Sequence, residues 1–376
     1  MQKPIEGSRR SGINLLRRAS NKLNRAFGRR DDGEPKAALP LKLASTIQSA
    51  IDDMALKNTD HVLIHTADGN IYEALNLVFS SADQVLPHFH VCTPYDPNGV
   101  MPNQAFPGRV SDIVKEWERR RFLDDFVHLY AENPRLAGHL SRLWLVQVAS
   151  LDAPLVIDVA DAKRVFTVHD PAVGMRDRII ISALGPARVE KGFHILPDIV
   201  SGLIARIESA GREAKYPHFV IQSTPQIVGY TKPITEALER LAVFEPEWVT
   251  FIPDVLNGEA FLREISASDV VLMPYGHEQY RYRGSIIAME ALCLGKIIVA
   301  TEDTYPASLI FGGSGETAQS TSDFVDALLR ILQNFDEYAA EARLQAMRYL
   351  EARADENYVR FCLARASDRG ALGVRQ

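Results

Sequence analysis

The sequence has few cysteines and no long apolar run, and each shortage excludes a class of protein. Its three cysteines, Cys92, Cys293 and Cys362, lie far apart in 376 residues and form no CxxC pair. We therefore expect no disulfide framework, as is usual in a reducing compartment. No apolar run reaches the roughly 18 residues of a membrane-spanning helix, and the N-terminus lacks the apolar segment of a signal peptide. These absences predict a cytoplasmic protein.

An overall excess of basic charge is missing as well. The formal net charge is −6 at pH 7, so we expect no nucleic acid as a partner of the whole chain. Residues 1–30 are the exception, with nine Lys or Arg, one acid and apolar residues at helical spacing. They form either a solvated tail or a basic amphipathic helix that makes peripheral contact with the inner face of a membrane.

The chain does have the composition and rhythm of a globular α/β protein. Hydrophobic residues make up 46% and charged residues 24%, and apolar strand-like runs alternate with helical patterns. The expected strands are residues 61–65, 86–92, 126–130, 143–148, 179–184, 218–222, 249–252, 270–273 and 296–300. The expected helices are residues 41–57, 71–79, 110–122, one ending at 142, 191–209, 234–243, 259–266, 286–294, 322–334 and the helical stretch 337–366.

This rhythm predicts two Rossmann-like domains with parallel sheets, joined near residues 160–177. The predicted parts are residues 1–40 for a basic tail and linker, 41–165 for an N-terminal domain, 166–340 for a C-terminal domain and 341–376 for a C-terminal helix and tail. In such sheets, ligands bind beyond the carboxyl ends of the strands. The loops that we expect to matter follow Leu184, Thr224, Pro253 and Pro274.

A glycine-led basic loop follows the strand 179–184. It reads Gly-Pro-Ala-Arg-Val-Glu-Lys-Gly from Gly185 to Gly192 and is expected to open the helix 191–209. Gly185 permits a tight turn, and Arg188 and Lys191 add positive charge where a helix start already favours an anion. The pattern indicates a diphosphate site, with an ordinary strand–helix turn carrying surface cations as the alternative.

A second segment, residues 274–296, follows another strand. Gly284 and Ser285 open the predicted helix 286–294, so early backbone N–H groups such as that of Ile286 can meet phosphate oxygens. Glu290 in this helix has apolar neighbours and needs a partner if it is buried. Two adjacent ribose hydroxyls would suit its carboxylate, whereas an exposed glutamate paired with Lys or Arg is the alternative.

Together these segments resemble the group 1, family-4-like, retaining glycosyltransferases of the GT-B fold. That family carries a G-R-x-x-x-x-K-G loop and an E-x7-E motif followed by A-x-x-x-G-K. Gly185 and Lys191-Gly192 keep the first spacing, and Glu290-Ala-Leu-Cys-Leu-Gly-Lys keeps the end of the second. The resemblance covers residues 178–335. It implies an α/β chain of two Rossmann-like domains facing a cleft, an acceptor domain first and a nucleotide-sugar-binding domain second.

The resemblance also implies roles for individual residues. The donor diphosphate would be bound by Gly185, Arg188, Lys191, Gly284, Ser285 and Ile286, and the ribose by Glu290. Two positions depart from the family pattern. The arginine after the loop glycine is Pro186 here, so Arg188 takes its place. The first glutamate of E-x7-E is Tyr282, so residues 280–283 form a donor-side surface, and Glu278 and Tyr282 become catalytic candidates.

Histidines are the remaining catalytic candidates. His65, at the end of the strand 61–65, is the strongest, ahead of His88 and His90, although each is otherwise a packed or surface histidine. No further His or Cys stands at ligand spacing, so we expect neither a metal nor a cofactor besides the donor. A serine hydrolase is not supported, because no G-x-S-x-G occurs.

The sequence therefore predicts a hexosyltransferase-like enzyme. It would move a sugar from a nucleoside diphosphate to a hydroxyl of a glycan or lipid-linked acceptor, with retention, in glycan or polysaccharide biosynthesis. Two alternatives stay open. One is a non-catalytic scaffold that binds nucleotide-sugar, which Tyr282 favours. The other is a nucleotide-sugar 2-epimerase, which shares the fold.

Overall fold

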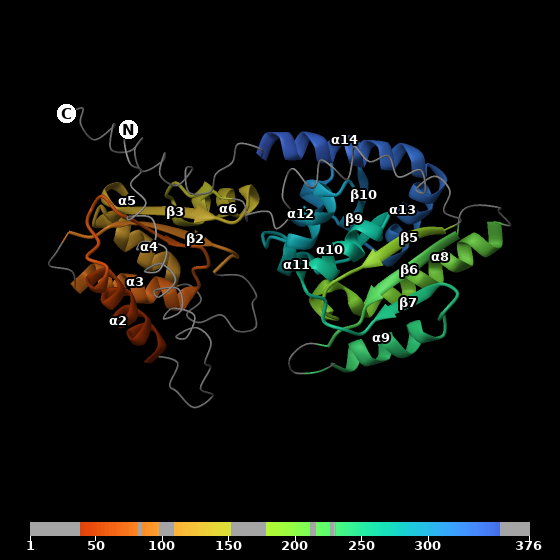
Figure 1. Cartoon of the computed structure of the whole chain (residues 1–376), viewed down its shortest axis with the longest axis horizontal. Coiled ribbons are helices and arrows are strands. Elements are labelled where there is room, and N and C mark those ends of the chain that lie inside the picture. Colours follow the sequence, from red (N-terminus) through yellow and green to blue (C-terminus); the bar gives the residue numbers. More distant parts are fainter. Residues whose placement is uncertain are drawn as a thin grey trace, which may run out of the picture. The chain divides into compact units, whose positions relative to one another are not determined.

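The chain is described from a computed structural model. The structure describes residues 38–81, 85–97, 109–151, 178–210, 216–225, 229 and 231–353. These residues divide into two compact units, one ending at Leu151 and the other beginning at Arg178 (Figure 1). The basic segment 1–30, the expected junction 160–177 and the helical stretch after residue 353 lie outside the described residues.

The first unit is a parallel sheet with helices. Its elements are α2 (Ala38–Asp53), β1 (His61–Ile64), α3 (Gly69–Ser81), β2 (His88–Thr93), α4 (Arg109–Arg119), α5 (Phe122–Asp125), β3 (Val127–Ala131), α6 (Pro134–Trp144) and β4 (Ala149–Ser150). The strand order is β1-β2-β3-β4, and every pairing is parallel. Aromatic residues hold the helices on the sheet, since Phe79 of α3 packs against both Phe89 of β2 and Trp117 of α4.

Several predicted bounds in this unit are wrong, and the predicted helix 41–57 already ends at Asp53. Residues 143–148 are not a strand, because α6 continues to Trp144 and buries Leu136, Leu140 and Trp144 at intervals of four. The apolar run there comes from one helix face, and Leu145 is 84% exposed. The helix 110–122 is broken by Arg121, whose φ is 63°. Helix α2 begins before residue 41, because proline is tolerated in a first helical turn.

The second unit holds a larger parallel sheet. Its strands are β5 (Arg178–Ala183), β6 (Tyr216–Gln222), β7 (Val249–Ile252), β8 (Val270–Met273), β9 (Ile297–Thr301) and β10 (Gly315–Ala318). Its helices are η1 (Val189–Lys191), η2 (Phe193–Ile195), α8 (Leu196–Ala210), α9 (Lys232–Ala242), α10 (Gly258–Ala267), α11 (His277–Tyr280), α12 (Ile286–Cys293), η3 (Pro306–Leu309), α13 (Thr321–Gln333) and α14 (Phe335–Arg353).

The strand order of this sheet is β10-β9-β8-β5-β6-β7, and every pairing is parallel. From β5 the chain first winds to one side, through β6 and β7, and then to the other, through β8, β9 and β10. The order therefore reverses between β5 and β8. In open α/β sheets such a switch point is where ligands bind, outside the carboxyl ends of the strands.

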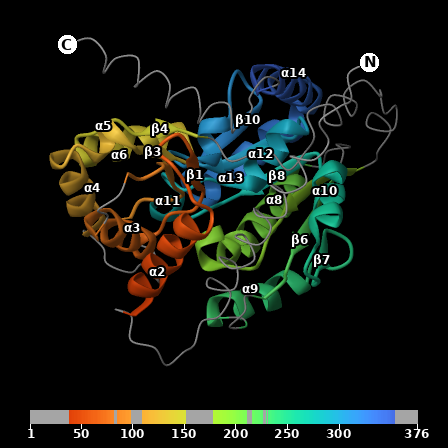
Figure 2. The same ribbon diagram turned by 60° about the vertical axis from the view of Figure 1, so that its left-hand side comes forward.

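Helices cover both faces of the second sheet. In β8, Val270 and Leu272 pack into a core with α8, α9 and α13, whereas Val271 and Met273 pack into a second core with α10 and α12. Helices α8 and α9 lie along β6 and β7 in both views (Figure 1, Figure 2). Burial on both faces explains the continuous apolar runs of these strands.

The structure adds elements here that the apolar pattern did not predict. The short elements α11, η3 and β10 have too few apolar residues to form a recognisable period. The predicted helix 191–209 begins at Leu196, because Gly192, with φ at 71°, separates two 3₁₀ turns that precede it. Among the described residues, no helix combines the length and apolar character needed to cross a membrane.

Candidate functional site

Two loops meet at the switch point of the second sheet. The glycine loop, residues 185–192, follows β5, and the tyrosine loop, residues 274–285, follows β8. The backbone N–H of Gly276 donates to the carbonyl of Glu190 at 2.8 Å. Gly192 lies against the backbone of Pro274, where a Cβ would overlap the carbonyl oxygen. Main-chain contacts therefore join two segments that the sequence places far apart.

The glycine loop is held from below by a buried glutamine. Gly185 has a φ of 100°, a conformation that favours glycine, and its N–H donates to Gln222 Oε1 at 2.6 Å. Gln222 donates in turn to Thr224 Oγ1 at 3.0 Å and to the carbonyl of Asp254 at 3.4 Å. The Ala187 N–H donates to the carbonyl of Thr224 at 2.9 Å. The loops after β5, β6 and β7 thus form one hydrogen-bonded unit.

The cations of the glycine loop lie together above it. The ammonium of Lys191 stands directly over Gly185, because a Cβ on that glycine would overlap Nζ. Burial, together with the charges of Arg188 and Arg283, lowers the pKa of Lys191 to about 8 against the opposing effect of Glu190. Arg188 Nη1 lies 3.6 Å from Glu190 Oε1, while its buried Nε has no hydrogen-bond partner among the described residues.

The start of α12 lies beside the same glycine. A Cβ on Gly185 would come within 3.1 Å of Ile287 Cδ1. Ser285 caps the helix by accepting from the Ala288 N–H at 3.3 Å, as expected for a helix that Gly284 and Ser285 open. The first N–H groups of a helix, here those of Ile286 and Ile287, have no acceptor within it. The helix start therefore adds positive potential next to the Lys191 ammonium.

Glu290 is buried rather than exposed. Its side chain is 4% exposed, which removes the alternative of a solvated surface ion pair. Glu290 lies one turn after Ile287, the residue that contacts Gly185, and on the same side of α12. Burial raises its pKa to about 7, and its Oε2 has no hydrogen-bond partner among the described residues. Glu290 is therefore a buried carboxylate on the helix whose start lies beside Gly185 and Lys191.

The other two candidates of the tyrosine loop belong to a more exposed network. Glu278 Oε1 lies 3.3 Å from His277 Nδ1, and the other ring nitrogen of His277 lies 3.2 Å from Asp303 Oδ2. The Arg281 guanidinium lies 3.1 Å from the Asp303 carboxylate. It also lies 5.5 Å from the centroid of the Tyr282 ring. Glu278 and Tyr282 therefore lie along the outer part of this loop.

The third catalytic candidate, His65, belongs to the first unit. It follows β1, its Nδ1 lies 3.3 Å from Thr66 Oγ1, and burial lowers its pKa. The described residues contain no group of three or more His, Cys, Asp or Glu suited to a metal ion.

His88 and His90 are packed into a cluster of imidazoles on neighbouring strands. His61 Nδ1 lies 3.0 Å from His90 Nε2, and His88 Nδ1 lies 3.2 Å from His128 Nε2. His90 Nδ1 lies 3.0 Å from the Tyr130 hydroxyl, and His90 is 1% exposed. These contacts give His90 the environment of a packed histidine. The sequence signal that could have revealed the cluster is the occurrence of histidines in three neighbouring strands, with His61 in β1, His88 and His90 two positions apart in β2, and His128 in β3.

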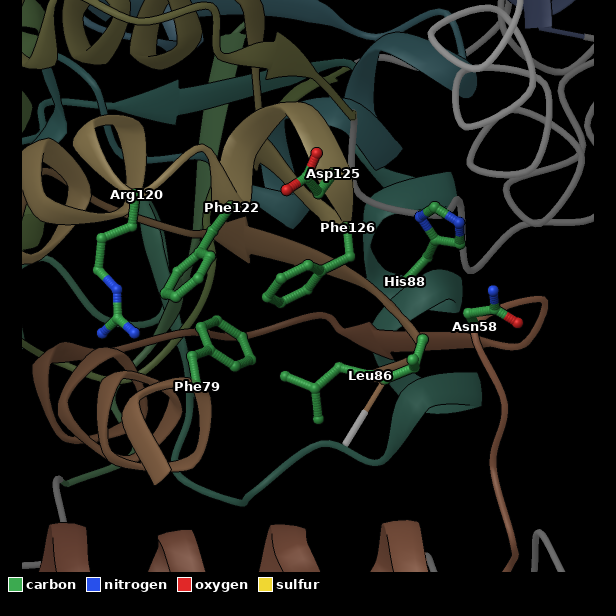
Figure 3. Close-up of a pocket in the computed structure, with 9 residues that line it drawn as sticks. Asn58, Phe79, Leu86, His88, Arg120, Phe122, Asp125 and Phe126 are labelled. Carbon is green, nitrogen blue, oxygen red and sulfur yellow. The ribbon is translucent and has the colours of Figure 1, made fainter. Parts of the chain in front are cut away.

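The first unit also contains an aromatic hollow of about 420 Å³ (Figure 3). Phe79, Phe122 and Phe126 form its wall, with Arg120 at one end and Asp125 and His88 at the other. It lies where β2 and β3 begin, at their amino ends. In open parallel sheets, ligands bind at the carboxyl ends of the strands. This hollow lies at the amino ends and is therefore not at the position expected for a substrate.

Comparisons with known proteins identify the fold. No family model matches the chain, and no curated protein matches its sequence significantly. A solved glycosyltransferase from Rickettsia africae ESF-5 matches with a TM-score of 0.61 at 13% identity, over 91% of this chain and 83% of that one. Sucrose-phosphate synthase from Thermosynechococcus elongatus gives 0.56 at 16% identity, over 91% and 81%.

A third solved structure has a nucleotide-sugar analogue bound. It is described as trehalose-6-phosphate from E. coli bound with UDP-2-fluoroglucose, and it gives a TM-score of 0.60 at 14% identity, over 92% of this chain and 82% of that one. These neighbours are GT-B proteins, and the predicted α/β fold of two parallel-sheet domains is confirmed. At such low identity the similarity is one of fold.

Proposed function

We propose that the protein is a glycosyltransferase that uses a nucleoside-diphosphate sugar. The observation that carries this proposal is the placement of Arg188 and Lys191 around Gly185, with the buried, unpartnered Glu290 carboxylate on the adjoining helix. The GT-B neighbours support it, and one of them was solved with UDP-2-fluoroglucose. The resemblance of the two motifs to the retaining family supports transfer of a hexose with retention.

Each group in the site has a matching partner in such a donor. A diphosphate carries two negative charges over several oxygens, and Lys191, Arg188 and the N–H groups at the start of α12 supply charge and donors. A buried carboxylate without a partner is unfavourable, so Glu290 gains most from a ligand that donates two hydrogen bonds. The adjacent hydroxyls of a ribose provide them, and no resident cofactor is needed for either contact.

The transfer step follows from this arrangement. The bond between the sugar's anomeric carbon and the diphosphate oxygen breaks, and its electron pair stays on that oxygen. The acceptor hydroxyl oxygen forms the new bond to the same carbon. Lys191, Arg188 and the helix start stabilise the negative charge that develops on the leaving diphosphate. That diphosphate takes the proton from the acceptor hydroxyl, and Glu278, Tyr282 and His65 are the side chains proposed to position the sugar and acceptor.

Binding is tested first with Lys191→Ala. Isothermal titration of the wild type with UDP, GDP and ADP identifies the preferred nucleotide. We expect Lys191→Ala to weaken its binding at least tenfold, because the variant removes the ammonium above Gly185. Lys232→Ala is the matched control, since the Lys232 side chain is 87% exposed on α9 and pairs with Glu236 at 3.6 Å. Equal affinities in both variants would remove the diphosphate role.

Release of nucleoside diphosphate separates the three functions. A transferase releases it only when an acceptor extract is added, an epimerase converts the donor to a new isomer, and a scaffold does neither. Tyr282 at the position of the family's first glutamate is the observation that favours the scaffold. Fractionating the extract into glycans and lipid-linked glycans then identifies the acceptor and shows whether the pathway is glycan or polysaccharide biosynthesis.

The proposed cytoplasmic location includes peripheral contact with a membrane. The basic residues 1–30 would supply it by attraction to anionic lipid. Sedimentation with liposomes of phosphatidylglycerol, before and after deletion of residues 1–35, tests this contact. Equal sedimentation of both proteins would exclude it, without bearing on nucleotide binding.

A further inference from the structure

A pair of buried tyrosines lies beneath the cations of the site. The rings of Tyr275 and Tyr280, both in the tyrosine loop, have centroids 4.4 Å apart, and each residue is 3% exposed. Lys191 Nζ lies 5.7 Å from the centroid of Tyr275, and Arg283 Cζ lies 5.3 Å from that of Tyr280. Aromatic faces attract cations, so the pair fixes one cation on each ring.

Arg283 is not neutralised by an acid. Among the described residues its side chain has no ion pair, whereas the neighbouring Arg281 is bound to Asp303 at 3.1 Å. The charge of Arg283 is close enough to lower the pKa of Lys191, as does that of Arg188. Three cations are therefore gathered here, and Glu190 is the acid that opposes them.

The balance of charge indicates what this cluster binds. Glu190 lies 3.6 Å from Arg188 and offsets part of its charge, which leaves Lys191 and Arg283 as two further positive charges. A diphosphate esterified at both ends carries two negative charges. The cluster therefore matches such a diphosphate better than a phosphodiester, whose single negative charge would leave one cation unpaired.

We infer that Arg283, held on the ring of Tyr280, is a further diphosphate-binding residue that supplies the positive charge absent at Pro186. Two cations would then serve for the arginine that the family pattern has directly after the loop glycine: Arg188 from the same loop and Arg283 from the tyrosine loop. This inference rests on the proposed function, because it names a further residue of the same donor site. It assigns a role to the basic and aromatic character of residues 275–283.

The test compares Arg283→Gln with Arg263→Gln, a control on α10 whose side chain is 66% exposed and pairs with Glu259 at 2.8 Å. Affinity is measured by isothermal titration with inorganic pyrophosphate and with the nucleoside diphosphate that the wild type prefers. We expect Arg283→Gln to weaken the binding of both ligands at least tenfold, and Arg263→Gln to change either affinity less than twofold. We also expect Arg283→Gln to bind the corresponding nucleoside as the wild type does, since the nucleoside carries no phosphate.

Two further variants keep the test decisive. Arg283→Lys retains the charge and should recover most of the affinity, whereas Tyr280→Leu removes the ring and should weaken pyrophosphate binding with Arg283 still present. Circular dichroism and melting temperature show whether each variant is folded. A change below twofold in a folded Arg283→Gln protein overturns the inference and leaves the proposed function standing. If the wild type binds neither pyrophosphate nor any nucleoside diphosphate, the proposed function itself fails, and the inference with it.

Discussion

Gly192 lies against the backbone carbonyl of Pro274, so closely that a Cβ at position 192 would overlap the oxygen. Its φ of 71° lies in the left-handed region, which a side chain also disfavours. Two independent restrictions, one of conformation and one of space, therefore require glycine where the glycine and tyrosine loops meet. The geometry of the site depends on this contact between two backbones.

Gly192→Ala should therefore destabilise the second unit strongly. Left-handed backbone alone costs about 1–2 kcal/mol in a residue with a side chain, and displacement of Pro274 adds to it. Gly313→Ala is the control, because Gly313 has a φ of 86° but no atom lies within 4 Å of the position that its Cβ would take. Urea unfolding measures both, and we expect the loss at position 192 to exceed that at 313. Equal losses of unfolding free energy in the two variants would show that Pro274 can move away from position 192 at no cost.

Nucleotide binding should weaken at high pH. The pKa of Lys191 is lowered to about 8, so the free protein loses this charge as the pH rises through 8. A bound diphosphate favours the protonated form, and the decline in affinity therefore appears above pH 8. In Lys191→Arg the charge persists, so its affinity should stay level from pH 7 to 9.5. Titration of both proteins over that range checks the prediction, which a parallel decline would contradict.

Glu290 should impose the opposite dependence at lower pH. Its pKa is raised to about 7, so it is protonated below that pH and becomes a carboxylate above it. Only the carboxylate accepts from both ribose hydroxyls. The affinity ratio of the wild type to Glu290→Gln should therefore rise between pH 6 and 8, and the ratio cancels ionisation of the ligand itself. Pyrophosphate, which has no ribose, should show no such rise.

The imidazole cluster should make the first unit sensitive to acid. Burial and the charges of His61 and His88 lower the pKa of His90 to about 4, compared with an ordinary value of 6.5. The unfolded chain takes up this proton first, so the stabilisation is complete above pH 6.5 and is lost as the pH falls towards 4. One such group changes stability by at most about 1.4 kcal/mol per pH unit.

Melting temperatures from pH 7.5 to 5 test this dependence. We expect the decline in the wild type to be steeper than in His90→Gln, which cannot take up the proton. His194→Gln is the control, because His194 is exposed in the second unit. If His90→Gln and the wild type decline in parallel, the cluster is not the source of the acid sensitivity.

Gln222→Ala should loosen the glycine loop. The change leaves the Gly185 N–H without its acceptor and removes the amide donor from Thr224 Oγ1, whereas the Asp254 carbonyl still accepts from the Thr224 hydroxyl. Leaving buried polar groups unpaired costs about 1–3 kcal/mol. Gln319→Ala provides the comparison, since Gln319 is an exposed glutamine that binds Glu302. We expect lower stability and weaker pyrophosphate binding for the first variant alone, measured by urea unfolding and titration.

The sequence predicted those parts of the site that depend on local pattern. The glycine loop and the start of α12 are short segments whose residue types determine their conformation, and the structure places them at adjacent strand ends. Gln222 and Tyr275 were not predicted as parts of the site, and Tyr280 was expected on a donor-side surface although it is buried. Gln222 acts on a glycine 37 positions away, and no local period indicates such a partner.

The errors in the fold have similar physical causes. Residues 143–148 were expected to form a strand because their apolar content is high, yet this content belongs to the end of α6 and a turn. The delayed start of α8 depends on Gly192 and its contact with a distant loop. The apolar pattern reports how many residues are buried in a segment, whereas the bounds depend on what the segment packs against.

The reversal of strand order between β5 and β8 has a consequence for how the protein acquires its site. The backbone N–H of Ile180 in β5 donates to the carboxylate of Asp269, which lies 89 positions later, immediately before β8. Contacts between such distant segments form slowly, since a long stretch of chain must first be ordered. A growing polypeptide therefore cannot bring β5 together with β8 and the start of α12 until about 110 further residues have been synthesised.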